Sequence, residues 1–380
     1  MKFRIAIILI AAVALTACGR SSRLPPLEPT ALTEISAQVD IRLDWNKTWS
    51  GSADSNFSTL VPAYSQGSVI VARQSGTVTS VNSTNGETRW SVSIDNEISA
   101  AAGVEDDIAV VVDADLNAIA FDSATGEPRW QKSLGKVVFA PPLVYQDRVF
   151  FKTIDGDLLA VDAATGEILW EAFYDQPAFV AIGSVRPLAF NNLVVVGNAD
   201  GRIIATNGES GFESWQIYLA SGGAEGLLNE VDPIPVIAAD RLFVADFSKA
   251  VVAYDLRTGA VLWQNRRQAD RWVTVNDASV FGFDENDNVF ALNIETGDVL
   301  WEQPGFIHRK LTHMALWRGY LVVSDSQGYI HALDTANGNI VGRSKIGEGL
   351  SFAGLHVDNE RLYATFRSGS LKAYTLRRIK

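Results

Sequence analysis

The sequence predicts an all-β fold, an eight-bladed β-propeller of four-stranded antiparallel blades. The first observation is a repeat of eleven residues in which a small residue opens an alternating stretch, Thr, Asn or in one copy Ser precedes Gly, and Trp follows that Gly by four positions. Seven copies occupy 80–90, 120–130, 160–170, 205–215, 253–263, 291–301 and 332–342, the last with Gly342 in place of Trp. Their spacing of about forty residues is the length of one propeller blade.

The second observation is the amino-acid sequence between successive copies of the motif. Residues 141–170 contain short runs of Val, Ile, Leu and Phe separated by Gln-Asp, Asp-Gly and Thr-Gly turns, with no helical spacing. Asp155-Gly156 and Asp200-Gly201 are typical of two-residue hairpins. We expect each motif Gly to adopt a left-handed conformation, which a side chain would strain. The glycines concerned are Gly86, Gly126, Gly166, Gly211, Gly259, Gly297 and Gly338.

The periodic Trp residues are interpreted as packing between neighbouring blades. A large ring buries roughly 150–250 Å², and its truncation to Ala is expected to cost about 3–5 kcal/mol. The alternative, a cage of aromatic rings around a ligand, is disfavoured because regularity of a fold is an argument about structure rather than about a site.

The third observation is a repeat divided between the two ends of the chain. An eighth copy begins at Ala373, but the chain ends before its Trp. Residues 45–50, with Trp49, are predicted to supply the missing outer strand and to pair with residues 371–376. Such closure leaves no long sheet edge free and predicts one propeller domain over residues 41–380.

The first forty residues have a different composition. A basic start at Lys2 and Arg4 precedes an apolar run of eleven residues, which indicates a signal peptide over residues 1–17 rather than a membrane span. Cys18 is the only cysteine, so internal disulfides are excluded. Its setting resembles the bacterial lipobox, which implies cleavage before Cys18 and acylation of its thiol; the alternative is an ordinary signal peptide with a stray Cys. Residues 18–40, polar and Pro-bearing, are predicted to form a flexible tether with a mean reach of roughly 25 Å.

Charge narrows the class of partner. The chain carries −12, and removal of the signal peptide leaves −14, so nonspecific nucleic-acid binding is disfavoured. The local basic group Arg266, Arg267 and Arg271 is interpreted as a solvated face, with a basic contact patch as the alternative.

The chain resembles the BamB family of lipoproteins within the wider class of quinoprotein-like (PQQ-repeat) propellers. The resemblance covers essentially the whole chain and rests on the lipobox, the repeat motif and the later blades, at DLRTG 255–259, DEND 284–287, HRKLT 308–312 and DSQGY 325–329. It implies a non-catalytic scaffold without a cofactor, lipid-anchored at the periplasmic face of the outer membrane; Gly19 after the Cys agrees with this sorting. The implied partners are the POTRA domains of the barrel subunit BamA, other subunits of that assembly machinery, and unfolded outer-membrane proteins.

Two consecutive repeats are stretched, to 45 and 48 residues, and the extra length falls in 171–187 and 217–235. Loops on a rigid scaffold are where binding residues concentrate. By resemblance, Glu230 and Asp232 match an acidic pair that the family uses toward BamA; read alone, they are plain loop carboxylates. By resemblance, part of the first loop matches a segment of the family, at positions that include Phe179, Ala181 and Ile182. The family's segment contains an Arg that this chain lacks there, and Arg186 is the candidate substitute.

The enzymatic alternative is a periplasmic quinoprotein-like enzyme or small-ligand binder. Quinoprotein dehydrogenases resemble this chain in the Trp motif but add a quinone, calcium ligands and usually a vicinal Cys pair, which a single cysteine excludes. Asp284, Asn286, Asn288 and Glu295 imitate a calcium loop, yet Val289 stands where Gly is needed. The four histidines, His308, His313, His331 and His356, lack zinc-ligand spacing, and no nucleophile elbow or phosphate loop appears. We therefore expect no catalytic residues, no metal and no cofactor.

Overall fold

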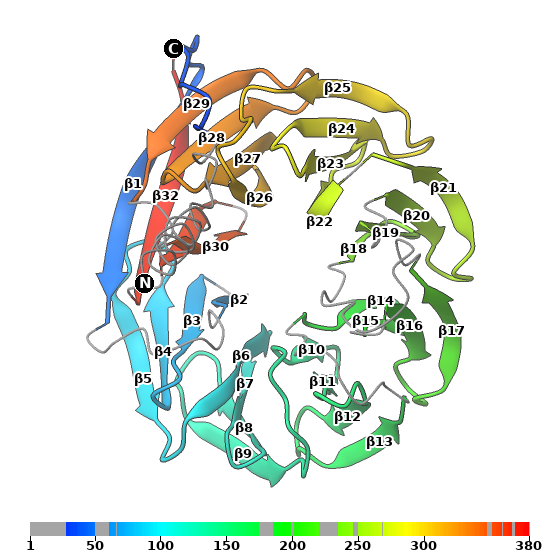
Figure 1. The fold of residues 1–380 in the computed structure, drawn as a ribbon. Coiled ribbons are helices and arrows are strands. Elements are labelled where there is room, and N and C mark those ends of the chain that lie inside the picture. Colours follow the sequence, from blue (N-terminus) through cyan, green and yellow to red (C-terminus); the bar gives the residue numbers. More distant parts are fainter. Residues whose placement is uncertain are drawn as a thin grey trace, which may run out of the picture.

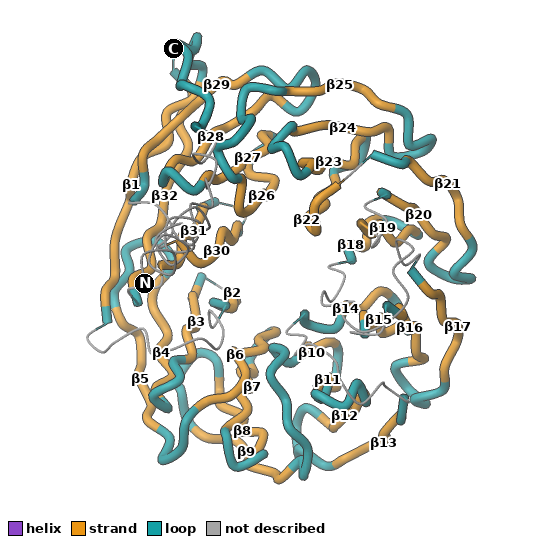
Figure 2. Tube along the Cα trace, viewed as in Figure 1, coloured by secondary structure: helices purple, strands orange, loops and turns teal. Residues whose placement is uncertain are grey.

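The computed structural model describes residues 28–49, 61–65, 67–174, 185–198, 201–219, 235–245, 250–267, 269–347, 352–358, 360–366 and 369–379. They form eight four-stranded antiparallel sheets arranged as the blades of a ring (Figure 1). Figure 2 shows strands joined by turns, with no helix among these residues. No helix long and apolar enough to cross a membrane therefore occurs in this part of the chain. The predicted fold class, an eight-bladed β-propeller, is confirmed.

Each blade runs from its innermost to its outermost strand in chain order. Blades 1 and 2 comprise β2 (Ala63–Ser65), β3 (Ser68–Ala72), β4 (Thr77–Asn82) and β5 (Thr88–Ser93), then β6 (Ile98–Glu105), β7 (Ile108–Asp113), β8 (Asn117–Asp122) and β9 (Pro128–Ser133). Blades 3 and 4 comprise β10 (Leu143–Tyr145), β11 (Arg148–Lys152), β12 (Leu158–Asp162) and β13 (Ile168–Ala172), then β14 (Leu188–Phe190), β15 (Leu193–Gly197), β16 (Arg202–Asn207) and β17 (Glu213–Tyr218).

The second half of the ring follows the same plan. Blades 5 and 6 comprise β18 (Val236–Ala238), β19 (Arg241–Ala245), β20 (Val251–Asp255) and β21 (Val261–Asn265), then β22 (Ala269–Val275), β23 (Ser279–Asp284), β24 (Val289–Asn293) and β25 (Val299–Gln303). Blade 7 comprises β26 (Leu311–Trp317), β27 (Tyr320–Asp325), β28 (Tyr329–Asp334) and β29 (Ile340–Lys345). Blade 8 comprises β30 (Phe352–Val357), β31 (Leu362–Phe366), β32 (Ser370–Arg378) and, from the other end of the chain, β1 (Val39–Thr48).

The ring closes as predicted, but the tryptophan assigned to the closing strand was the wrong one. β1 pairs antiparallel with β32, and Trp45 lies opposite Ala373, as Trp90 lies opposite Ser80 in blade 1. Trp45, not Trp49, therefore occupies the motif position of blade 8. The two residues lie four apart, and the motif Gly that would have chosen between them is absent from the N-terminal copy.

The motif Trp and Gly link successive blades. In each case the indole Nε1 donates a hydrogen bond of 2.8–3.1 Å to a backbone carbonyl of the following blade. The ring lies over that blade's motif Gly, whose φ is between 71° and 78°; a Cβ placed there would come within 2.5–3.0 Å of the indole. The glycine thus serves both the left-handed turn and the close approach of the neighbouring ring.

The seventh copy has Gly342 instead of Trp because the closing strand occupies that space. A Cβ at Gly342 would lie 2.6 Å from Cγ2 and 2.9 Å from the carbonyl oxygen of Val39 in β1. β1 thus lies against β29 at the seam between blades 7 and 8. The irregularity in the sequence marks the position where the two ends of the chain meet.

The core lies between the blades. One cluster combines Val110 and Val112 of blade 2 with Val149 and Phe151 of blade 3, and the other seams repeat this arrangement. β7 is buried over its whole length. Burial of both faces explains why the middle strands are continuous apolar runs, whereas outer strands alternate exposed and buried positions.

Candidate partner-binding face

One face of the ring carries the connections between blades. Because strand direction alternates within a blade, the connection from each outer strand to the next inner strand lies on the same side as the hairpin between the second and third strands. Backbone hydrogen bonds join the two kinds of segment, as in Leu134 N–H to Leu116 O (2.8 Å) and Leu219 N–H to Gly201 O (2.9 Å). We call this side the connection face. Both stretched segments begin on this side, directly after β13 and after β17.

The stretched connections each begin beside an exposed aromatic side chain. Phe173 follows β13 directly and Tyr218 ends β17, and they are 68% and 69% exposed. Both stand three positions after the motif Trp. The corresponding residues of the other blades are Thr48, Ser93, Ser133, Arg266, Pro304 and Lys345. Blades 3 and 4 thus differ from the rest at one defined position.

Phe173 is held in place by a charged group. Lys136 Nζ lies 5.2 Å from the centroid of the Phe173 ring, a cation–π distance. The same ammonium is 3.1 Å from Asp157 Oδ2 and 3.2 Å from Glu171 Oε1. Hydrogen bonds from the lysine to these two carboxylates raise its pKa. The cation is thereby fixed beneath a ring whose other side is open to solvent.

The next residue anchors the chain to both blades. The Tyr174 N–H donates to Asp157 Oδ1 (3.1 Å) in blade 3, and its hydroxyl lies 2.6 Å from Thr206 Oγ1 in blade 4. Tyr174 is buried, and burial raises the pKa of its phenol. The first stretched connection therefore starts from a rigid point at the seam between blades 3 and 4.

Arg186 leads into β14, the innermost strand of blade 4. Its side chain is exposed to solvent, although surrounding protein atoms lower its pKa while Glu105 raises it. Glu105 ends β6, and burial and then Asp106 raise its pKa, while Arg186 lowers it. Arginine remains charged under either influence. Because the side chain is exposed, this charge is accessible to a binding partner. The guanidinium lies within electrostatic reach of the Glu105 carboxylate.

The other predicted site residues cannot be placed. Cys18, Phe179, Ala181, Ile182, Glu230 and Asp232 lie outside the described residues. Sequence reasoning selected the connections that contain five of them but missed Phe173 and Tyr218. Alignment of the repeats at the third position after each Trp would have found both, because that position is otherwise occupied by non-aromatic residues.

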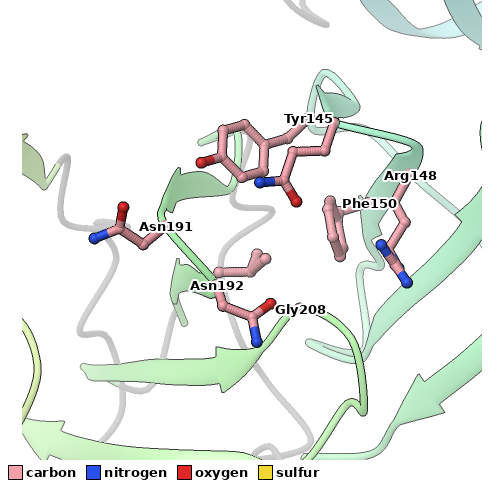
Figure 3. A pocket seen from close by; sticks show the side chains of 8 residues that line it. Tyr145, Arg148, Phe150, Asn191, Asn192 and Gly208 are labelled. Atoms are coloured by element: carbon pink, nitrogen blue, oxygen red, sulfur yellow. The ribbon is translucent and has the colours of Figure 1, made fainter.

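A small notch lies at the same seam on the opposite face. Figure 3 shows its lining residues, which come from blades 3 and 4: Tyr145, Gln146, Arg148, Phe150, Asn191, Asn192, Val194 and Gly208. Its enclosed volume is about 10 Å³, and it opens to solvent. Ligand and cofactor pockets usually have about 300–1,000 Å³. Arg148 is paired with Asp147 at 2.5 Å, so the notch presents no free charge of its own.

The calcium-like loop is a hairpin turn. Asp284 Oδ1 accepts the N–H groups of Asn286 and Asn288, both at 2.9 Å, and Glu295 is paired with Arg241. The carboxylates of Asp284 and Glu295 thus have other partners. No group of three or more metal-binding side chains occurs in the described part of the chain.

In the basic group, Arg267 is paired with Glu302 and stacks on Phe290.

Two histidines lie on the innermost strands of neighbouring blades. Burial lowers the pKa of His313 in β26 to about 4. Burial and then the charge of His313 lower the pKa of His356 in β30 to about 4. Tyr64, on the innermost strand of blade 1, lies 6.2 Å from His356 between ring centroids. Both imidazoles are neutral at neutral pH, which suits packing rather than charge recognition.

Comparison with known proteins agrees with the geometry. A family model described as outer membrane protein assembly factor BamB matches residues 74–303. A Kangiella koreensis protein with the same description is 37% identical over 372 residues, 96% of this chain and 94% of the relative. A Yersinia pestis relative is 30% identical over 204 residues, so the match spans about half of each chain (53% and 52%). The crystal structure of BamB from Moraxella catarrhalis has a TM-score of 0.76 at 25% identity, covering 88% of this chain and 99% of that one. The chain therefore belongs to the BamB family of outer membrane protein assembly factors.

Proposed function

We propose that this chain is a non-catalytic scaffold subunit of the machinery that assembles β-barrel proteins in the outer membrane. Its lipid would be attached at Cys18, and its connection face at blades 3 and 4 would bind the POTRA domains of the barrel subunit BamA. In this role it assists the delivery of unfolded outer-membrane proteins. Membership of the BamB family supports the machinery, and the resemblance in the two stretched connections supports the partner.

The single observation that carries the proposed contact is the pair of exposed aromatic rings. Phe173 and Tyr218 precede the two stretched connections on adjacent blades, and both are more than two-thirds exposed. Aromatic side chains, tyrosine above all, are enriched among the residues that carry binding energy. Phe173 in addition contacts the ammonium of Lys136, and a ring that already has a partner loses less entropy on binding. These rings, with Arg186 and the carboxylates Glu230 and Asp232, define the proposed contact.

A binding measurement tests this contact. The variant Phe173→Ser with Tyr218→Ser should weaken binding to the periplasmic domains of BamA by about tenfold or more, equivalent to about 1.4 kcal/mol or above. Its thermal stability should be unchanged, because both rings are exposed. The matched control is Val299→Ser with Leu300→Ser on β25, two apolar side chains 43% and 49% exposed on blade 6. Equal affinity of both variants would remove the rings from the contact.

The acidic pair is tested separately. Glu230→Lys with Asp232→Lys should abolish co-purification with BamA and leave the fold intact. The reason is that two attractive charges become repulsive ones, which changes both encounter and affinity. Undiminished co-purification would show that the second stretched connection does not carry the contact.

A further inference from the structure

The N-terminal segment that precedes the closing strand is bound to blade 7. Thr30 donates to the carbonyl of Ile307 through its N–H (3.0 Å) and its hydroxyl (2.6 Å). Gln38 N–H donates to Val341 O (2.8 Å) in β29. Residues 28–38 were predicted as part of a flexible tether, but they follow a path fixed by hydrogen bonds at both ends.

Two arginines, one just before β26 and one in β29, add a second set of contacts to this segment. Arg309 Nη1 donates to Thr30 O (2.8 Å), and Arg343 Nη1 donates to Thr33 O (3.0 Å). Both acceptors are backbone carbonyls. The segment is therefore held through its main chain, while most of its side chains remain exposed.

One buried carboxylate organises both arginines. Asp325 Oδ2 accepts from Arg309 Nε (2.7 Å) and from His331 Nε2 (3.0 Å), and His331 Nδ1 accepts from Arg343 Nε (3.2 Å). Asp325 and His331 are completely buried, and Arg309 is 5% exposed in its side chain. Burial lowers the pKa of His331, so the neutral ring bridges Asp325 and Arg343. The guanidinium groups are thus oriented before the segment binds.

The path of the segment gives it a direction. It leaves β1 beside the outer strand β29 and reaches Ile307, which lies in the connection between blades 6 and 7, on the connection face. In Figure 1 this dark-blue segment lies beside blade 7, across the ring from blades 3 and 4. The exit point of the N-terminus and the two stretched connections therefore share one face of the propeller.

We propose that Arg309 and Arg343 form a latch that holds residues 28–38 and thereby turns the connection face toward the membrane. This orientation rests on the proposed lipidation of Cys18. Only twelve residue steps separate Cys18 from Thr30, and a chain of this length spans at most about 40 Å. A partner embedded in the same membrane presents its periplasmic domains from that side, where the stretched connections begin.

The latch itself is tested in solution with the mature chain carrying Cys18→Ser. Spin labels at Ala31→Cys and Asn286→Cys should give a narrow distance distribution, because residue 31 is held against the propeller. Thr30→Pro removes the N–H and the hydroxyl that donate to Ile307, and the segment lies outside the blades. This variant should therefore broaden the distance distribution. Thr30→Ser keeps both donors and should leave it narrow. Arg343→Gln, a substitution outside the segment, should also broaden the distance distribution. A broad distribution in the parent chain would overturn the latch.

Orientation is tested with the lipidated chain in phospholipid vesicles. A dye at Asn286→Cys marks the connection face, and a dye at Ala336→Cys, in the turn between β28 and β29, marks the opposite face. Energy transfer to acceptors in the headgroup layer should be stronger from position 286, and Thr30→Pro should abolish this difference. Equal transfer from the two positions, with a narrow distribution in solution, would overturn the orientation but not the latch. Failure of the chain to float with vesicles would instead refute the lipid anchor, and the orientation with it.

Discussion

The contact between the motif Gly and the preceding blade's Trp makes a quantitative prediction at Gly126. Its φ is 78°, and a Cβ there would lie 2.7 Å from Cδ2 and Cε3 of Trp90. That ring is 8% exposed and donates to Ser123 O at 3.0 Å, so it cannot retreat without loss of packing and of the hydrogen bond. Gly126→Ala should therefore cost about 1–2 kcal/mol for the left-handed backbone and about 1–3 kcal/mol more for overpacking.

The matched control is Gly135→Ala. Gly135 has a φ of 63° with no atom within 4 Å of its would-be Cβ, so this substitution should cost only the backbone strain, about 1–2 kcal/mol. Urea unfolding followed by far-UV circular dichroism measures both. In a chain with Trp90→Ala, the cost of Gly126→Ala should fall to that of the control, because the ring it meets has gone. Equal costs in the parent chain, or no relief by Trp90→Ala, would refute the inter-blade role of this glycine.

Three further predictions follow from the same structure. Trp45→Ala should lower the free energy of unfolding by about 3–5 kcal/mol and Trp49→Ala by clearly less, since only Trp45 occupies the motif position; equal losses in urea unfolding would contradict the reassignment. The pKa of His313 and of His356 is about 4 in the fold and about 6.5 in the unfolded chain. As the pH falls, the unfolded chain therefore takes up protons before the folded chain does. The free energy of unfolding should thus drop between pH 6.5 and 4 by on the order of 3 kcal/mol per ring. His356→Gln should reduce that slope, and an unchanged pH profile would disprove the desolvation of this ring. Pyrroloquinoline quinone with calcium should not raise the melting temperature in scanning calorimetry, and a clear rise would favour the quinoprotein alternative.

The regular part of the fold was accessible from the sequence because one short motif carries its physics. The Gly and Trp of the motif, represented by Gly126 and Trp90, recur with a period near forty residues. The number of blades, the turn conformation and the packing role of the Trp ring could therefore all be predicted. Trp45 was misassigned because the N-terminal copy lacks the Gly that sets the register. Gly342 became intelligible only when Val39 was seen to occupy the space of its missing indole.

The partner-binding face and the bound N-terminal segment could be predicted only in part. The stretched period located the connections after β13 and β17, but Phe173 and Tyr218 required the repeats to be compared at a non-motif position. The contacts of the N-terminal segment could not be predicted, because Arg309 and Arg343, far away in sequence, bind the backbone carbonyls of Thr30 and Thr33, and a carbonyl carries no sequence signal. Asp325, which orients those arginines, has the sequence appearance of a turn residue.

The most direct test of the proposed function is extraction of the native chain from its membrane in mild detergent, followed by identification of what comes with it. We predict co-purification with a barrel protein that carries POTRA domains, and loss of that protein when Phe173→Ser and Tyr218→Ser are combined. A chain that is extracted alone, or a barrel partner retained undiminished by this variant, would contradict the proposed contact at blades 3 and 4.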